Sequence, residues 1–139
     1  MTELIDGTKD DISPGARVGA IFGALDNQDI ETFLGFLAED VVVYFGNEEP
    51  IEGTGNFAGL FAAVMSAVKG VKHEVHDVWQ VAGDPAVLIA RLTVHYTRPD
   101  DIVVSLPVCN VFRLRDDHRI FEYRVYMDMA PVFATGSAN

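Results

Sequence analysis

The chain has 139 residues, of which 49% are hydrophobic and 22% are charged, a composition typical of a single globular domain. Its formal net charge is −11, and a negative field of this size repels phosphate backbones and anionic lipid surfaces. We therefore expect neither nucleic acid nor a membrane as a partner. The first residues, MTELIDGTKDD, lack the basic region and apolar run of a signal peptide, so we expect a cytoplasmic protein.

Three helices are predicted in the first half of the chain. Residues 1–12 are polar and form a predicted mobile lead-in. Ser13 and Pro14 are typical of a helix start, and Asp29 caps a second helix. A third helix begins near Thr54 and is apolar on most of its sides, which indicates packing on most sides.

The strands of the predicted sheet come mostly in the second half. A β-branched strand at 41–45 lies between the second and third helices. Four longer strands follow the third helix, at roughly 71–82, 86–98, 102–115 and 118–128. Short turns between consecutive long strands predict an antiparallel meander, and helices followed by strands predict an α+β fold. We expect one domain over 13–130 and a tail over 131–139.

The last two predicted strands carry a few polar residues among apolar ones. Asn110, Tyr123 and Arg124 interrupt runs of hydrophobic side chains between residues 106 and 128. Three such residues are too few for a solvated face, whereas ligand pockets are lined by apolar groups with a small number of polar ones. This pattern predicts a ligand-binding pocket against the sheet.

Three segments carry a family resemblance: FLAEDVVVYFGNEEPIEG, IARLTVHYTRP and VFRLRDDHRIFEYRVYMD. With the order of elements from Ser13 to Asp128, they resemble the nuclear transport factor 2-like superfamily, which includes ketosteroid isomerase, limonene-epoxide hydrolase and SnoaL-like polyketide cyclases. The resemblance implies a cone-shaped fold in which three N-terminal helices pack on a curved antiparallel sheet and enclose a cavity. It also implies a homodimer formed through the outer sheet face.

The aspartates that carry protons in these relatives have no counterpart at the matching positions. The resemblance places Thr93 and Val125 where the epoxide hydrolases have two aspartates, and Val125 also replaces the aspartate of the cyclases. Phe45 occupies the position of the base of ketosteroid isomerase. We therefore expect no limonene-type epoxide hydrolysis.

Alternation along the strands predicts which residues face the pocket. The starting point is that Arg91 matches the cavity-facing arginine of the epoxide hydrolases, so that every second residue from it faces the cavity as well. The predicted lining is Tyr44, Phe61, Ile89, Arg91, Thr93, His95, Leu106, Val108, Asn110, Tyr123, Val125 and Met127.

Among these residues, His95 is the predicted acid/base, because imidazole changes charge near neutral pH. Arg91 and Tyr44, with Asn110, are then placed to hold a carbonyl or enolate oxygen. The alternative is that His95 is a hydrogen-bonded packing residue near the end of its strand.

No metal or cofactor is expected. In the segment HEVHD, His73 and His76 would face opposite sides of a strand and could not easily share one ion. Cys109 is the only cysteine, so no intramolecular disulfide is possible.

Two functions remain open from the sequence. The first is a small-molecule isomerase, lyase or cyclase that acts on an apolar, carbonyl-bearing ligand. The second is a non-catalytic binding protein for a hydrophobic or acidic metabolite, and a dimerisation module with a residual cavity is a third interpretation.

Overall fold

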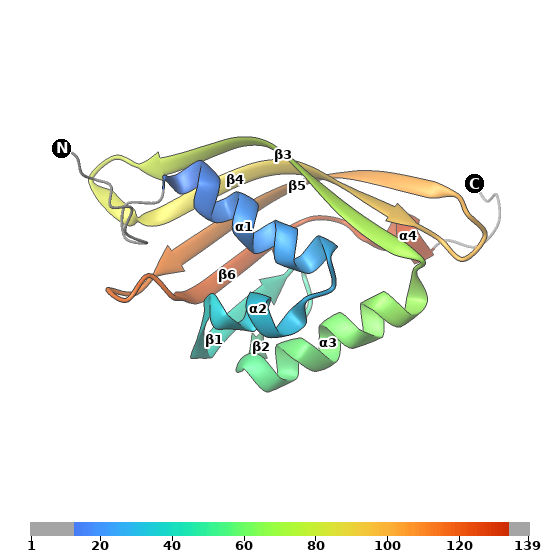
Figure 1. Ribbon diagram of the computed structural model, residues 1–139, viewed down its shortest axis with the longest axis horizontal. Helices are drawn as coiled ribbons and strands as arrows, with labels where there is room; N and C mark the ends of the chain where they lie inside the picture. Colours follow the sequence, from blue (N-terminus) through green and yellow to red (C-terminus); the bar gives the residue numbers. More distant parts are fainter. Residues whose placement is uncertain (1–12, 134–139) are drawn as a thin grey trace.

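The structure, a computed structural model, describes residues 13–133, within which four helices and six strands follow one another (Figure 1). The predicted lead-in over 1–12 and residues 134–139 of the predicted tail lie outside the described residues. The elements are α1 (Pro14–Asp26), α2 (Ile30–Gly35), β1 (Leu37–Phe45), β2 (Ile51–Glu52), α3 (Thr54–Ala67), β3 (Gly70–Val81), β4 (Asp84–Thr97), β5 (Val103–Leu114), β6 (Ile120–Tyr126) and α4 (Ala130–Phe133).

The first two helices begin with the side-chain caps that the sequence predicts. The hydroxyl of Ser13 accepts a hydrogen bond from the backbone N–H of Ala16 at 3.2 Å, and Pro14 occupies the first helical position. The Asp29 carboxylate accepts from the N–H of Thr32, also at 3.2 Å, and hydrogen bonding by the side chain and backbone of Thr32 lowers the pKa of the Asp29 carboxyl. The two caps fix where α1 and α2 start, and with them the short turn that joins the helices.

The six strands form one sheet in the order β2-β1-β6-β5-β4-β3. Strands β3 to β6 are the predicted antiparallel meander. The expectation of a wholly antiparallel sheet is wrong at β1, which pairs in parallel with β6, so the sheet is mixed. Between these two strands the chain passes through β2, α3 and strands β3 to β5. So long a connection leaves either direction open, where a tight turn would force antiparallel pairing.

The helices lie on one face of the curved sheet, and most of the buried side chains lie between the two layers (Figure 1). Helix α1 packs on β3, whereas α3 contacts α2, β1 and β2 and does not pack closely on the meander. Its apolar side chains Leu60, Phe61, Val64 and Met65 are consequently only half-buried. The space between α3 and the meander is where the candidate site lies.

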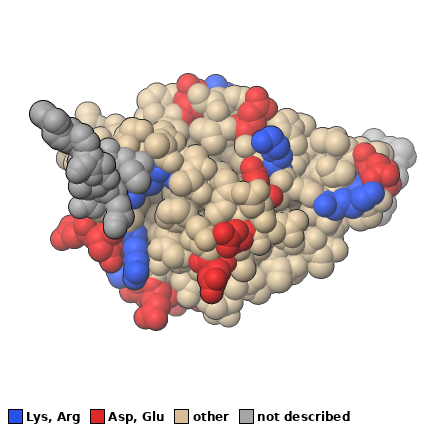
Figure 2. Space-filling model, viewed as in Figure 1, with Lys and Arg blue, Asp and Glu red and all other residues tan. Residues whose placement is uncertain are grey.

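Charged side chains are as sparse on the visible surface as the composition indicates (Figure 2). On the face shown in Figure 2, charged side chains stand in small separate groups, and Lys and Arg form no continuous patch there. None of the helices within residues 13–133 is long and apolar enough to cross a membrane.

Candidate active site

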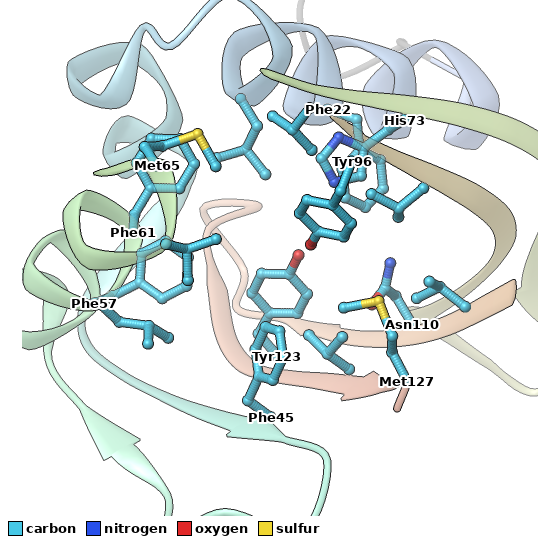
Figure 3. A pocket seen from close by; sticks show the side chains of 17 residues that line it. Phe22, Phe45, Phe57, Phe61, Met65, His73, Tyr96, Asn110, Tyr123 and Met127 are labelled. Carbon is cyan, nitrogen blue, oxygen red and sulfur yellow. The ribbon is translucent and has the colours of Figure 1, made fainter. Parts of the chain in front are cut away.

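A pocket lies between α1, α3 and the concave face of the sheet (Figure 3). It is lined by Phe22, Leu25, Phe45, Phe57, Leu60, Phe61, Val64, Met65, Val71, His73, Val94, Tyr96, Val108, Asn110, Tyr123, Val125 and Met127. The cavity volume is about 60 Å³, which is room for several water molecules or a small ligand. The flexible side chains of Met65 and Met127 would have to move for anything larger.

Four polar side chains stand among this apolar lining: His73, Tyr96, Asn110 and Tyr123. The other lining residues within the described chain are aliphatic, aromatic or methionine. A mostly apolar chamber with a few convergent polar groups is the usual form of a small-molecule site. In the same described part of the chain, no cluster of three or more His, Cys, Asp or Glu side chains is arranged to hold a metal ion.

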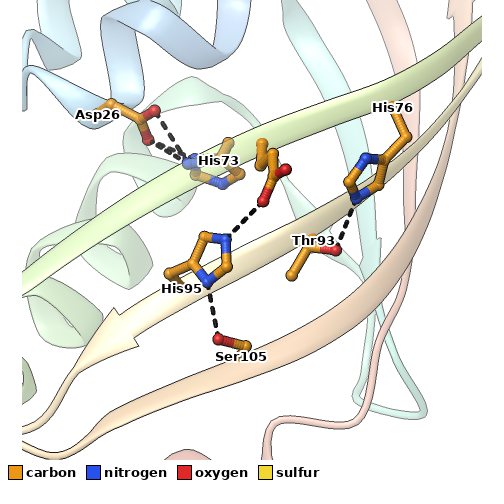
Figure 4. Close-up of polar contacts among 7 residues, drawn as sticks. Asp26, His73, His76, Thr93, His95 and Ser105 are labelled. Carbon is orange, nitrogen blue, oxygen red and sulfur yellow. Dashed lines mark hydrogen bonds and ion pairs between the residues drawn. The ribbon is translucent and has the colours of Figure 1, made fainter.

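His73 lines the pocket (Figure 3), and behind it its side chain pairs with that of Asp26 at the end of α1 (Figure 4). The imidazole Nδ1 lies 2.5 Å from Oδ1 of Asp26, and the two side chains are 9% and 19% exposed. An ionised carboxylate can only accept hydrogen bonds, so Nδ1 carries the hydrogen. In the neutral form of this ring, the other nitrogen, Nε2, has a lone pair that can take up a proton.

Three contacts hold this imidazole in place. The backbone N–H of His73 donates to both carboxylate oxygens of Asp26, at 2.9 and 3.1 Å. The ring of Phe22 stacks on the imidazole with centroids 4.6 Å apart and an interplanar angle of 21°. Asp26 is the last residue of α1, and because α1 packs on β3 the end of the helix meets the backbone of the strand at His73.

Two tyrosines face each other across the pocket. Tyr96 comes from β4 and Tyr123 from β6, and their phenol oxygens point toward one another in Figure 3. Burial raises the pKa of Tyr96 to about 12. Burial also raises the pKa of Tyr123, and the neighbouring Tyr96 adds to that increase. Both phenols therefore keep their hydrogens at neutral and moderately alkaline pH and can donate to a ligand oxygen.

Asn110 on β5 is the fourth polar group, and it is 2% exposed. Its Oδ1 is the one buried side-chain nitrogen or oxygen without a hydrogen-bond partner among residues 13–133. A buried acceptor without a partner costs about 1–3 kcal/mol of stability. Such a cost is typical of a functional group kept for a ligand.

Six of the residues expected to line the pocket do lie in its wall. They are Phe61, Val108, Asn110, Tyr123, Val125 and Met127. Leu106 is buried in the core beside the pocket and does not reach it.

The orientation predicted for β4 is wrong, because Ile89, Arg91, Thr93 and His95 face the outer side of the sheet, away from the helices. The buried residues of β4 are the alternate set Leu88, Ala90, Leu92, Val94 and Tyr96. A shift of one residue moves every side chain of a strand to the other face. From Leu88 to Val94 this inward set is apolar, so simple alternation predicts it; the assumed match of Arg91 to a cavity arginine overrode that signal.

The outward residues of β4 have partners of their own (Figure 4). Arg91 pairs with Asp77 at 2.7 Å, and Thr93 bonds His76 at 2.8 Å. His95 bonds Ser105 at 2.7 Å through Nδ1 and Glu74 at 2.9 Å through Nε2. The hydrogen bond from His95 lowers the pKa of the Glu74 carboxyl.

Tyr44 also faces outward, contrary to the prediction. The guanidinium of Arg124 lies over its ring at 3.9 Å from the centroid, while Val41, Val43 and Phe45 of the same strand point inward. His95, Arg91 and Tyr44 therefore do not meet in the chamber.

His73 and Asp26 were missed as a pair by sequence reasoning. His73 alternates with Val71 and Val75, which is the pattern of an inward-facing strand position, and this signal was available. Asp26 lies 47 residues away in sequence, at the C-terminal end of α1, so nothing local links it to His73.

The chain matches one protein-family model and several solved structures. The family model of the SnoaL-like domain matches residues 18–123. An LEH-like epoxide hydrolase from Mycobacterium tuberculosis is 28% identical, with 84% of this chain and 83% of that chain covered and a TM-score of 0.68. No curated protein matches.

Two more distant structures share the fold and were solved with small molecules. TerC co-crystallised with polyporic acid is 17% identical to this chain. The match covers 87% of this chain and 96% of TerC, with a TM-score of 0.74. A protein from M. tuberculosis in complex with estradiol-17beta-hemisuccinate is 15% identical, with coverages of 84% and 94% and a TM-score of 0.72.

The unpartnered amide of Asn110 predicts a variant that is more stable than the natural chain. Replacing it by leucine, which has a similar volume, removes the unsatisfied acceptor and should raise the free energy of unfolding by about 1–2 kcal/mol. Urea denaturation at pH 7 measures this difference. A lower midpoint for Asn110→Leu would show that the amide is satisfied and stabilising in solution.

The raised pKa of Tyr96 predicts how stability falls at alkaline pH. The unfolded chain loses this proton near pH 10 and the folded chain near pH 12, so the associated stability is present below pH 10 and lost as pH rises toward 12. Tyr96→Phe should therefore lose about 1 kcal/mol less than the wild type between pH 9 and pH 11. Urea unfolding at both pH values measures this, and an equal fall in the two proteins would contradict the assignment.

Proposed function

This chain belongs to the SnoaL-like domain family, and on that basis we propose that it is a small-molecule enzyme that transfers a proton at a carbon next to a carbonyl group. The observation that supports the proposal is that His73, in the wall of an apolar pocket, is held by a hydrogen bond to Asp26. Isomerases, lyases and cyclases that act through an enolate begin with such a transfer, and this step needs no cofactor when the protein supplies both a base and donors for the carbonyl oxygen.

His73 is the proposed base. Its Nε2 takes a proton from the carbon beside the carbonyl, and the electron pair of that C–H bond forms a carbon–carbon double bond as negative charge moves to the carbonyl oxygen. The imidazolium that results lies against the Asp26 carboxylate, which stabilises its charge at 2.5 Å. Asp26 thus acts through His73, by fixing its tautomer and its orientation.

Tyr96 and Tyr123 are the proposed donors to the oxygen that gains charge. Both are buried and remain protonated, and donors already in place in a water-poor site stabilise an enolate more effectively than water does. The proton on His73 then returns to another carbon of the ligand in an isomerase, or to a departing group in a lyase. In a cyclase, the enolate carbon attacks a second carbonyl carbon and the proton goes to the oxygen formed there.

The lining supports an uncharged ligand. Within residues 13–133, none of the lining residues is Lys, Arg, Asp or Glu, and the Arg91 that would have favoured an acidic ligand pairs with Asp77 on the outer face. Epoxide hydrolysis of the limonene type is not proposed, because Val125 in the pocket wall stands where the resemblance expects a carboxylate.

A binding protein for a hydrophobic metabolite is the second candidate. The observation in its favour is the small open space, which a ligand could fill without leaving room for a second reactant. The candidates differ in one property, since the enzyme needs Nε2 of His73 as a base and the binding protein does not.

Deuterium exchange distinguishes them. In D₂O the protein should accelerate exchange of the acidic C–H hydrogens of acetophenone or 2-tetralone, followed by NMR, because Nε2 forms the enolate reversibly. His73→Gln should slow this exchange by roughly 100-fold or more, since general-base catalysis contributes about that factor. Asp26→Asn should slow it as well, because the carboxylate no longer selects the tautomer.

His95→Gln is the matched control, because it changes a histidine on the outer face and should leave exchange unaltered. Thermal melts of all three variants establish that they are folded. Equal exchange by the wild type and His73→Gln would exclude the proposed base, and the absence of exchange with either ketone would favour the binding protein.

We further propose a cytoplasmic homodimer formed through the outer face of the sheet. Trp79 and Tyr126 lie on this face and are 49% and 55% exposed. Aromatic residues are enriched in the centres of interfaces.

Light scattering tests the dimer. The wild type should have twice the 15.2 kDa mass of one chain, and Trp79→Glu should shift it to the mass of one chain because the charge would be buried in the interface. Ala20→Glu adds the same charge to the exposed side of α1 and should leave the dimer intact. A wild-type mass of a single chain would contradict the dimer.

A further inference from the structure

A hydrogen-bonded chain of three side chains lies on the outer face of the sheet, away from the pocket. His95 on β4 lies between Ser105 on β5 and Glu74 on β3 (Figure 4). We propose that Ser105 is an activated nucleophile and that these three residues form a second reactive site, which takes the acyl group of aryl esters. The inference is independent of the proposed function, because the pocket lies on the other face of the sheet.

The first argument is the order of hydrogen bonds around His95. Its Nε2 lies 2.9 Å from Oε1 of Glu74, and its Nδ1 lies 2.7 Å from Oγ of Ser105. The bond from His95 lowers the pKa of the Glu74 carboxyl, which is therefore ionised at neutral pH and can only accept. In the neutral ring Nε2 thus carries the hydrogen, and Nδ1 accepts the hydroxyl hydrogen of Ser105. A hydroxyl bonded to a base that a third group orients is the arrangement of an activated serine.

The second argument is that the register of the strands brings these side chains together. His95 pairs directly with Ser105 on β5 and with Lys72 on β3, while Glu74 pairs with Thr93, the next outward residue of β4. The β-carbons of directly opposite residues are roughly 4.5–5.5 Å apart, and diagonal neighbours such as Glu74 and His95 are still within reach of long side chains. The site is therefore built on paired strands, whose backbone fixes the positions of all three residues.

The third argument concerns the ligand. Ser105 is exposed, and the outward residues on either side of it on β5, Val103 and Pro107, are exposed and apolar, which suits an apolar acyl group. Lys72 lies in the same cross-strand row and brings a positive charge toward the oxygen that gains charge. Because the site is open to water, this stabilisation is small. The substrate class is therefore esters with a good leaving group, such as aryl esters.

The reaction is the transfer of an acyl group from the ester to water. Oγ of Ser105 attacks the carbonyl carbon, and its hydrogen passes to Nδ1 of His95. The bond from the carbonyl carbon to the phenol oxygen breaks, and the phenol leaves with that hydrogen. Water then attacks the acyl-serine, while His95 takes a proton from the water and returns it to Oγ. One ester and one water molecule thus give one carboxylic acid and one phenol.

The proposed dimer does not have to cover this end of the outer face. Ser105 lies near the turn between β4 and β5, roughly 13 Å along β5 from the residue that pairs with Tyr126. His95 lies roughly 20 Å along β4 from the residue that pairs with Trp79. An interface centred on these two aromatic residues can therefore form while Ser105 stays accessible.

The aryl ester 4-nitrophenyl acetate tests the site. The wild type should release nitrophenol and carry an acetyl group on Ser105, located by mass spectrometry of peptides, and Ser105→Ala should lose both. His95→Gln should slow acetylation of Ser105 by roughly 100-fold, since general-base catalysis contributes about that factor. Ser66→Ala is the matched control: Ser66 is an exposed serine whose hydroxyl donates to the backbone carbonyl of Ala63, and this variant should cleave the ester as the wild type does.

Thermal melts establish that the variants are folded. Acetyl groups found only on lysines or histidines, equal acetylation of Ser66 and Ser105, or unchanged ester cleavage by Ser105→Ala would each overturn the inference. Nitrogen-15 NMR tests the role of Glu74: the wild type should carry the hydrogen of His95 on Nε2, and Glu74→Gln should lose this preference. A hydrogen on Nδ1 in the wild type would leave the hydroxyl of Ser105 without its base and would also overturn the inference.

Discussion

The contact between Asp26 and His73 is the interaction on which the rest of the site depends. One carboxylate accepts the backbone N–H and the imidazole N–H of the same residue, so it joins the end of α1 to β3 and orients the ring in a single step. The stacked ring of Phe22 comes from the same helix. Helix α1, which closes one side of the pocket, therefore also holds the imidazole of His73, the proposed base, in position.

The second constraint is that α3 stays away from the meander. A helix with so many apolar side chains would normally bury them against the sheet, yet most of them are only half-buried here. They form a wall that faces tyrosines and an asparagine on the opposite strands. The fold thus leaves hydrophobic stabilisation unused and keeps a buried amide unsatisfied, as expected where a site for a ligand is retained at some cost in stability.

Much of the fold could be predicted from local sequence signals. Ser13, Pro14 and Asp29 mark helix starts through interactions within a few residues, and the turns of the meander are equally local. The parallel pairing of β1 with β6 could not be predicted in this way, because it joins segments that are about 80 residues apart, such as Val43 and Tyr123. No local pattern records such a contact.

The site was only partly predictable for two different reasons. Asn110 and Tyr123 stand out as polar residues in apolar strands, and the pocket does contain them. The error on β4 came from anchoring the alternation to Arg91, although the apolar residues from Leu88 to Tyr96 already marked the inner face. The pairing of His73 with Asp26 is a matter of tertiary packing between α1 and β3, and it became visible only with the structure.

The state of the His73 ring nitrogens tests the central claim most directly. Nitrogen-15 NMR of the ligand-free protein at neutral pH should show the hydrogen on Nδ1 and a bare Nε2, and Asp26→Asn should abolish this preference because the carboxylate that selects the tautomer is gone. A hydrogen found on Nε2 in the wild type, whether alone or together with one on Nδ1, would leave that nitrogen without a lone pair. That result would contradict the assignment of His73 as the base.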